Sequence, residues 1–201
     1  MSTGIMERLR EQTSEEHKRM ENNEYAKAIM DGSMTREQYR RYLILFYGFI
    51  KAAENEIYPD SQLEELGLSE ADRAKAPLIE QDLLYLGLTP GQIGELPLCL
   101  ELPDLSATAK KLGYLYVLEG STLGGQIISR KIGSSLQLEP GAGLSYFYAY
   151  GDETRSSWQK MREIIEQGAA GSEEQTITAA KETFRLLERW VVTAGQTLSS
   201  N

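Results

Sequence analysis

The chain has 201 residues, of which 41% are apolar, and it carries a formal net charge of −9. A chain of this length and composition can form one domain with a substantial core, and its acidity argues against nucleic-acid binding, which requires clustered lysines and arginines. The presence of one histidine and one cysteine excludes a histidine-cluster metal enzyme and an internal disulfide.

The sequence contains no signal for the membrane or for secretion. No stretch of about 18 consecutive apolar residues occurs, and the longest apolar region, 42–50, is short and flanked by Arg and Lys. The N-terminus lacks the apolar core of a signal peptide. The lone Cys99 suits a reducing compartment. We therefore expect a soluble cytoplasmic protein, not bound to membranes and monomeric.

Apolar residues recur at helical spacing along nearly the whole chain, and strand-like alternation is hard to find. The first predicted helix begins after Ser2 or Thr3, and Asn22-Asn23 interrupts it. A short helix over 24–30 follows, which Asp31-Gly32 ends as a C-cap. Thr35 and Gln38 match a capping box, and the helix that they open runs to about residue 57, before Pro59. The residues on the apolar face of the first helix are Ile5, Leu9, Thr13, His17 and Met20.

The second half of the chain is also predicted to be helical. A helix over about 72–86 ends at Gly87, Pro90-Gly91 marks a turn, and Pro97 and Pro103 bound an irregular segment. Further helices are expected over about 105–132, 152–167 and 172–198, with loops at 139–143 and 168–171. There is no internal repeat or long linker. The sequence therefore predicts a single all-α domain over residues 1–201.

His17 has two polar neighbours on its own helix face. At 100° per residue, Arg10 lies two turns before it on nearly the same face. Glu21 lies one turn after it, within reach of a ring nitrogen. Such a histidine is most often a helix-face residue with ordinary neighbours. If the protein uses imidazole chemistry, however, this residue must supply it.

Four glycines lie within the long helix over 105–132, at positions 113, 120, 124 and 125. Each interior glycine costs a helix about 1 kcal/mol relative to alanine, so their clustering requires a reason. One explanation is close helix–helix packing. The other is a flat ligand that lies against bare backbone, over which the helix bends.

These segments resemble the haem oxygenase family, in particular its bacterial branch, which includes enzymes that supply biliverdin to bacteriophytochromes. Leu-Arg-Glu-Gln-Thr-x-x-x-His-x-x-x-Glu-Asn (9–22) resembles the proximal-helix signature of the family. Gly-Ser-Met-Thr-Arg-Glu-Gln-Tyr (32–39) and Ala-Ala-Glu-Asn-Glu (52–56) resemble family segments in order and spacing. Leu-Glu-Gly-Ser-Thr-Leu-Gly-Gly (118–125) resembles the distal helix, and residues 146–158 match the C-terminal haem-contacting helix more loosely.

The resemblance implies a multi-helix bundle with haem b between a proximal N-terminal helix and a kinked, glycine-rich distal helix. His17 is then the iron ligand, with Thr13 beside it and Glu21 as the acceptor for its other ring nitrogen. Gly120, Ser121, Gly124 and Gly125 form the distal wall and leave space for O₂. Arg10 is the first candidate to meet a haem propionate, and Tyr114, Tyr116, Arg155 and Lys160 are further candidates.

The implied reaction converts haem, O₂ and electrons from a ferredoxin or flavoprotein reductase into biliverdin, CO and ferrous iron. The sequence departs from the family at Ser121, where many members carry an aspartate that organises proton delivery to bound O₂. Proton delivery must then use Ser121, Thr122 or water held by backbone carbonyls. This departure motivates a second hypothesis, a haem carrier or sensor on the same fold. A third is a thiaminase-like enzyme, for which Cys99 is poorly placed.

Overall fold

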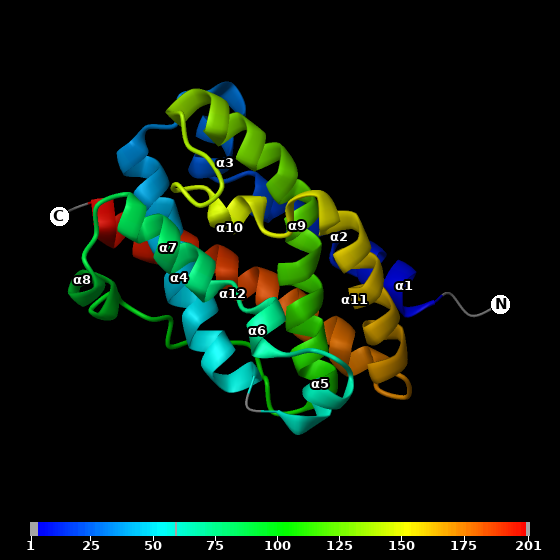
Figure 1. Cartoon of the computed structure of the whole chain (residues 1–201). Helices are drawn as coiled ribbons and strands as arrows, with labels where there is room; N and C mark the ends of the chain where they lie inside the picture. Colours follow the sequence, from blue (N-terminus) through cyan, green and yellow to red (C-terminus); the bar gives the residue numbers. More distant parts are fainter. Residues whose placement is uncertain (1–3, 59, 200–201) are drawn as a thin grey trace.

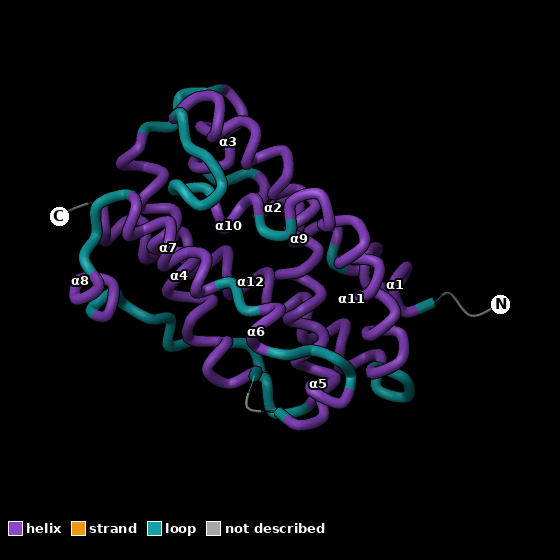
Figure 2. Tube along the Cα trace, in the orientation of Figure 1, coloured by secondary structure: helices purple, strands orange, loops and turns teal. Residues whose placement is uncertain are grey.

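The computed structural model describes residues 4–58 and 60–199, and this part of the chain is helical with no β-strand (Figures 1 and 2). Two isolated bridges in the 139–143 loop are its only β-type pairs. The all-α prediction is confirmed. The helices are α1 (Ile5–Gln12), α2 (Ser14–Glu21), α3 (Glu24–Asp31), α4 (Arg36–Ile57), α5 (Ser61–Glu65), α6 (Glu70–Arg73), α7 (Ala76–Tyr85), α8 (Pro90–Gly94), α9 (Thr108–Leu136), α10 (Ser145–Tyr148), α11 (Thr154–Gly168) and α12 (Glu173–Ser199), with a 3₁₀ turn η1 (Gly151–Glu153).

The predicted first helix is divided into α1 and α2 at Thr13. The helical backbone bonds continue across the division, since the amide of His17 donates to the carbonyl of Thr13 at 2.9 Å. The hydroxyl of Thr13 donates to the carbonyl of Leu9 at 2.8 Å, a bond of the kind that bends helices. Helix α1 begins at Ile5, and the predicted start after Ser2 or Thr3 lies outside the described residues.

The predicted boundaries of α3 and α4 are confirmed. Asn23 caps α3 by accepting from the amide of Ala26 at 2.9 Å, and Gly32 ends it in the left-handed region, at φ 79°. Thr35 and Gln38 form the predicted capping box of α4.

The single helix predicted over 72–86 is instead two helices, α6 and α7. Pro77 lies in the first turn of α7, where its missing amide hydrogen costs nothing, whereas inside a longer helix it would break a backbone bond. The turn predicted at Pro90-Gly91 begins the short helix α8, which Thr89 caps. Helices α5 and α10 fall in segments where no helix was predicted.

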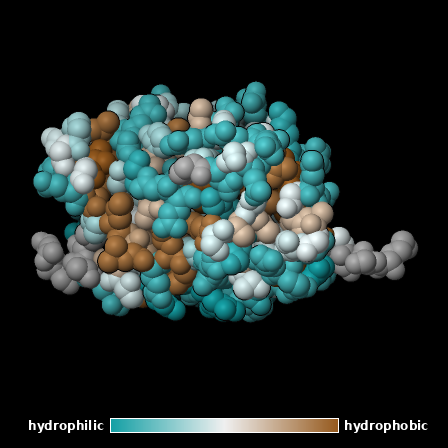
Figure 3. All heavy atoms as spheres, turned by 90° about the horizontal axis from the view of Figure 1, so that it is seen from below, coloured by the Kyte–Doolittle hydropathy of each residue, from teal (hydrophilic) through white to brown (hydrophobic). Residues whose placement is uncertain are grey.

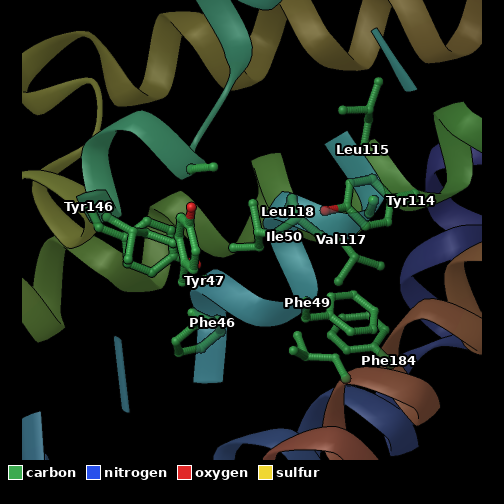
Figure 4. Packing of buried hydrophobic residues seen from close by; sticks show 14 of the residues in the cluster. Phe46, Tyr47, Phe49, Ile50, Tyr114, Leu115, Val117, Leu118, Tyr146 and Phe184 are labelled. Carbon is green, nitrogen blue, oxygen red and sulfur yellow. The ribbon is translucent and has the colours of Figure 1, made fainter. Parts of the chain in front are cut away.

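Helices α9 and α12 cross the middle of the molecule, and α4 and α11 pack beside them (Figure 1). Aromatic and aliphatic side chains of α4, α9, α10 and α12 meet in the core (Figure 4). Apolar side chains also reach the surface in places (Figure 3), and the exposed ones include Leu98, Leu100 and Val192. None of the described helices combines the length and apolar character needed to cross a bilayer.

Candidate functional site

His17 lies on α2 with its side chain 53% exposed. Its Nδ1 atom is 3.4 Å from Oε2 of Glu21, one turn later. The ring also meets Phe184 of α12 edge to face, with the centroids 5.7 Å apart. These two contacts orient the imidazole, and in the part of the chain that the structure describes its Nε2 atom makes no hydrogen bond. Nε2 is therefore the nitrogen available to a ligand.

Ion pairs with α12 hold α2 in place. Oε1 of Glu16 lies 3.1 Å from the guanidinium of Arg185, and Arg19 pairs with Glu188 at 3.1 Å. Burial alone would raise the pKa of the Glu16 carboxyl, but its backbone hydrogen bond and the charges of Arg185 and Lys181 outweigh this effect and lower the pKa below its usual 4.5. The helix that carries His17 is thus attached to one of the two central helices.

Two of the four glycines of α9 are explained by close packing. A Cβ atom on Gly113 would collide with the carbonyl oxygen of Thr176 on α12. A Cβ atom on Gly125 would lie 2.8 Å from the carbonyl oxygen of Phe147 on α10. At these positions the packing explanation is correct.

Gly124 is different, because a Cβ atom there would meet nothing within 4 Å. Packing within the chain therefore does not explain this glycine. A Cβ atom on Gly120, one turn earlier, would lie 3.3 Å from the indole ring of Trp158, which comes from α11. The backbone of α9 is thus bare and open at Gly124 and is covered by an aromatic ring at Gly120.

Helix α9 bends near these glycines (Figure 1). The hydroxyl of Ser121 donates to the carbonyl of Leu118 at 2.7 Å, and the hydroxyl of Thr122 donates to the carbonyl of Glu119 at 2.6 Å. Side-chain bonds of this kind compete with the backbone ladder and bend helices. The sequence therefore places both the flexible residues and the bending hydroxyls in one turn of the helix.

The N-terminal segment meets α9 at two points, and we call the region between α2 and the facing part of α9 the crevice. At one end Thr13 interacts with Tyr116, and at the other the ammonium of Lys131 donates to the carbonyl of Met30 at 3.1 Å. Between these two points no hydrogen bond, ion pair or ring contact joins α2 to α9 among the described residues. Here α9 exposes apolar side chains, with Leu123 40% and Ile127 49% accessible. This region therefore has the exposed imidazole of His17 on α2 and, on α9, the open backbone of Gly124 beside the exposed Leu123 and Ile127.

Two arginines, Arg10 and Arg162, lie near Tyr116 at one end of the crevice. Burial raises the pKa of the Tyr116 hydroxyl, while Thr13 and the charges of Arg10 and Arg162 oppose that rise. Arg10 is thus close to Tyr116. Arg162 was not predicted, although it lies one turn after Trp158 on α11 and shares its helix face.

The other two cations predicted on α11 are exposed. Arg155 lies about 60° around the helix from Trp158, whereas Lys160 lies about 160° from it, at 100° per residue. Arg155 therefore shares the crevice side of α11 and Lys160 faces away. Trp158 and Phe184 were also missed, because only the packing of α11 and α12 brings them to the crevice.

Tyr114 lies in the core and not at the crevice. Its ring stacks on Phe49 of α4, with centroids 6.3 Å apart, and its oxygen points inward toward Ile50 and Leu118 (Figure 4). The hydroxyl is buried without a hydrogen-bond partner, and burial raises its pKa well above the usual value. A surface role for Tyr114 would require a rearrangement of the α4–α9 contact.

The site suits a flat, largely apolar ligand with an anionic edge and a metal that needs one nitrogen ligand from the protein. No group of three or more His, Cys, Asp or Glu side chains that could hold a metal ion occurs in residues 4–58 and 60–199. Cys99 is a buried thiol that donates to the carbonyl of Glu101 at 3.3 Å, and burial raises its pKa. It takes no part in the crevice.

The chain is similar to known proteins over most of its length. A family model described as heme oxygenase matches residues 3–193. A heme oxygenase from Xanthomonas campestris is 26% identical over 160 residues, covering 78% of this chain and 90% of that relative. Heme oxygenase 1 from a Nostoc species is 26% identical over 185 residues, covering 83% of this chain and 75% of that relative.

The fold is shared with solved structures. Heme oxygenase-1 from a Synechocystis cyanobacterium, solved in complex with haem, superimposes with a TM-score of 0.76 at 17% identity, covering 98% of this chain and 95% of that chain. At this identity the similarity concerns the fold alone.

Proposed function

The chain belongs to the haem oxygenase family, and we propose that it binds haem in the crevice between α2 and α9 and degrades it to biliverdin, CO and ferrous iron. The observation that carries this proposal is that Nε2 of His17, the only histidine of the chain, makes no hydrogen bond among the described residues, while the backbone of α9 is open at Gly124. Haem is both substrate and cofactor, and it supplies the iron at which O₂ is activated.

The proximal residues fit this role. Nε2 of His17 is free to bind iron, while Nδ1 faces the carboxylate of Glu21 at 3.4 Å. A carboxylate on the second nitrogen fixes the tautomer and makes the first nitrogen a stronger ligand. Phe184 supports the ring from α12, and Thr13 lies one turn earlier.

The distal residues also fit. Open space over Gly124 admits a flat ring against the backbone, and the exposed Leu123 and Ile127 provide apolar contact. The chain has no second histidine, so it can place no peroxidase-type distal imidazole over the iron. Gly120 adds no side chain to this wall, whereas Gly125, which was expected to line it, packs against α10.

We assign proton delivery to Ser121 and Thr122, since the chain has Ser121 where many members of the family carry an aspartate. The hydroxyl proton of Ser121 is directed at the carbonyl of Leu118, so its oxygen retains lone pairs that accept a hydrogen bond from water in the crevice. We assign to Ser121 the holding of this water, with Thr122 bound to the carbonyl of Glu119 behind it.

The anionic propionates are assigned to the basic end of the crevice. Arg10 and Arg162 act on Tyr116 from two different helices, and Arg155 lies on the same side of α11. Tyr114 and Lys160 were expected to contribute, but one is buried in the core and the other faces away from the crevice. Arg10 and Arg162 are therefore the preferred partners.

The reaction also requires electrons from another protein, and we propose a ferredoxin or flavoprotein reductase in the cytoplasm as the donor.

The test of the proposed function begins with haemin added to the purified apoprotein. A histidine-ligated Soret complex should form at one haem per chain, and reductant plus O₂ should convert it to biliverdin. Stable haem under the same conditions would indicate a carrier or sensor, and failure to bind haem at micromolar concentration would reject the proposal.

A further inference from the structure

A buried cluster of charges lies directly behind the distal glycines. Glu119 precedes Gly120 on α9, and at 100° per residue its side chain points about 140° away from Gly124. Its two carboxylate oxygens lie 2.8 Å from the guanidinium of Arg73 and 2.6 Å from the ammonium of Lys75. The side chains of all three residues are at most 8% exposed. Glu119 is the only acidic residue of α9.

Tyr150 completes this cluster. Its hydroxyl lies 2.9 Å from both carboxylate oxygens of Glu119 and accepts from the ammonium of Lys75 at 2.8 Å. Both cations also lie over its ring, Lys75 at 4.6 Å and Arg73 at 5.5 Å from the centroid. Both carboxylate oxygens of Glu119 are therefore bound to groups from other segments of the chain.

The cluster joins α9 to the segment between α6 and α7. The ammonium of Lys75 donates to the carbonyl of Arg73 at 2.7 Å. Glu54 of α4 accepts from the amides of Lys75 and Ala76 at 2.6 and 3.1 Å. Four helices are thus fixed relative to one another at the turn where α9 bends.

Burying charges is costly, and an apolar cluster of the same size would often be as stable. In this protein the buried charges lie at one turn of α9, beside the glycines and the two hydroxyls that bend the helix. The titratable groups around Glu119 are Arg73 of α6, Lys75, the Tyr150 hydroxyl and Tyr58, and Glu54 adds a second carboxylate nearby. Two cations are therefore balanced by two carboxylates, and the loss of either sign leaves an uncompensated charge beside Gly120.

We propose that Arg73, Lys75, Glu119 and Tyr150 form a brace that fixes α9 at its bend and sets the electrostatic potential on the crevice side of Gly120. The part that concerns bound haem rests on the proposed function. Glu119 is in this account a positioning residue that acts through the helix backbone and through its charge.

The mechanical part is tested on the haem-free protein by hydrogen exchange. Glu119→Gln and Tyr150→Phe should accelerate exchange of the α9 amides over 120–127 by about tenfold or more, because the bend loses its anchor. Asp60→Asn is the matched control, since it removes another carboxylate paired with a cation of α9, Lys111, at 3.1 Å. It should leave exchange over 120–127 unchanged.

The electrostatic part is tested on the ferric haem complex. The pH midpoint of its acid–alkaline spectral transition should fall by about one unit in Glu119→Gln and rise in Lys75→Met, because the two variants change the local charge in opposite directions. A purely structural defect would move both midpoints the same way. Lys75→Met keeps this measurement available if Glu119→Gln does not fold.

The outcomes separate the two proposals. If the wild-type protein binds no haem, the proposed function fails, while the exchange experiment still decides the mechanical role. Exchange over 120–127 that is as slow in Tyr150→Phe as in the wild type overturns the mechanical role. Midpoints that shift in the same direction, or no further than in Asp60→Asn, overturn the electrostatic role.

Discussion

The Nδ1 atom of His17 lies 3.4 Å from the Oε2 atom of Glu21, one helical turn further along α2. This relationship leaves Nε2 as the nitrogen that faces a ligand and makes Glu21 the group that determines its donor strength. The proximal half of the site thus lies within two turns of one helix. The distal half is 100 residues away in sequence.

Glu21→Gln should weaken the histidine ligand without removing it. The amide that replaces the carboxylate carries no charge, so the imidazole becomes a poorer donor. Because Glu21 is 67% exposed, we expect the low end of the usual effect, a loss of haem affinity of about tenfold. The iron–histidine stretching frequency of the ferrous complex should fall, as measured by resonance Raman spectroscopy.

The control for this variant is Glu15→Gln on the same helix, where the carboxylate pairs with Lys18 at 3.1 Å. It should leave both the stretching frequency and the affinity unchanged. A frequency that is insensitive to Glu21→Gln would show that Glu21 does not act on the imidazole.

Gly124→Ala should stabilise the haem-free protein while harming haem binding. A Cβ atom at this position meets nothing within 4 Å, so the variant gains the helix propensity of alanine, about 1 kcal/mol. The same methyl group would occupy the ligand space, and we expect it to cost about 1–3 kcal/mol of haem binding. Thermal unfolding of the apoprotein and haemin titration measure the two effects separately.

Gly125→Ala provides the contrast, because its Cβ atom would lie 2.8 Å from the carbonyl oxygen of Phe147. This variant should destabilise the apoprotein itself. If Gly124→Ala also destabilised the apoprotein, the space over Gly124 would not be open as described.

The sequence predicted the elements whose causes are local. Two such features are the C-cap at Gly32 and the capping box of Thr35 and Gln38, each of which depends on residues a few positions apart. Both features lie where they were predicted. The break between α6 and α7 also has a local cause, Pro77. The apolar periodicity around it, however, predicts one continuous helix. The packing explanation is correct at Gly113 and Gly125, and the ligand explanation stays a prediction at Gly124; only the tertiary contacts of each glycine distinguish the two cases.

The site residues that were missed depend on long-range packing. Trp158 and Arg162 share a helix face, yet nothing in their own segment indicates that α11 lies against Tyr116. Glu119 meets Arg73 and Lys75 from more than 40 residues away. Tyr114 was expected as a further partner of a haem propionate, but its own face of α9 is turned to the core.

Arg10→Ala and Arg162→Ala should each reduce haem affinity about tenfold, since each removes a cation that can bind a propionate. The loss should shrink at high ionic strength because the groups are partly exposed. Haemin titrations at low and high salt measure both effects. The isomer composition of the biliverdin formed should also change if these residues set the rotation of the ring.

Lys160→Ala is the matched control on α11, because it removes a cation from the opposite face of the helix. It should bind haem as tightly as the wild type. Equal losses in Lys160→Ala and Arg162→Ala would mean that only the net charge of α11 matters, contrary to the assignment of Arg162.

The attachment of α2 to α12 should weaken in acid. The folded-state pKa of Glu16 is lowered below 4.5, so its contribution to stability is complete above that pH and is lost as the pH falls through the lower, folded-state value. We expect this contribution to be about 1 kcal/mol, because the partner Arg185 is exposed and its charge is screened.

Urea unfolding of the wild type and of Glu16→Gln between pH 3 and pH 7 checks this prediction. The difference in unfolding free energy should be largest near neutral pH and should narrow below about pH 4. A difference that stays constant across this range would contradict the ion pair as its cause.

The most direct test of the central claim is haemin titration of His17→Ala, followed spectroscopically with and without added imidazole. Because His17 is the only histidine, we predict that the variant loses the histidine-type Soret spectrum and the conversion of haem to biliverdin, and that free imidazole restores the spectrum. A variant that forms the wild-type complex and degrades haem at the wild-type rate without imidazole would contradict the account.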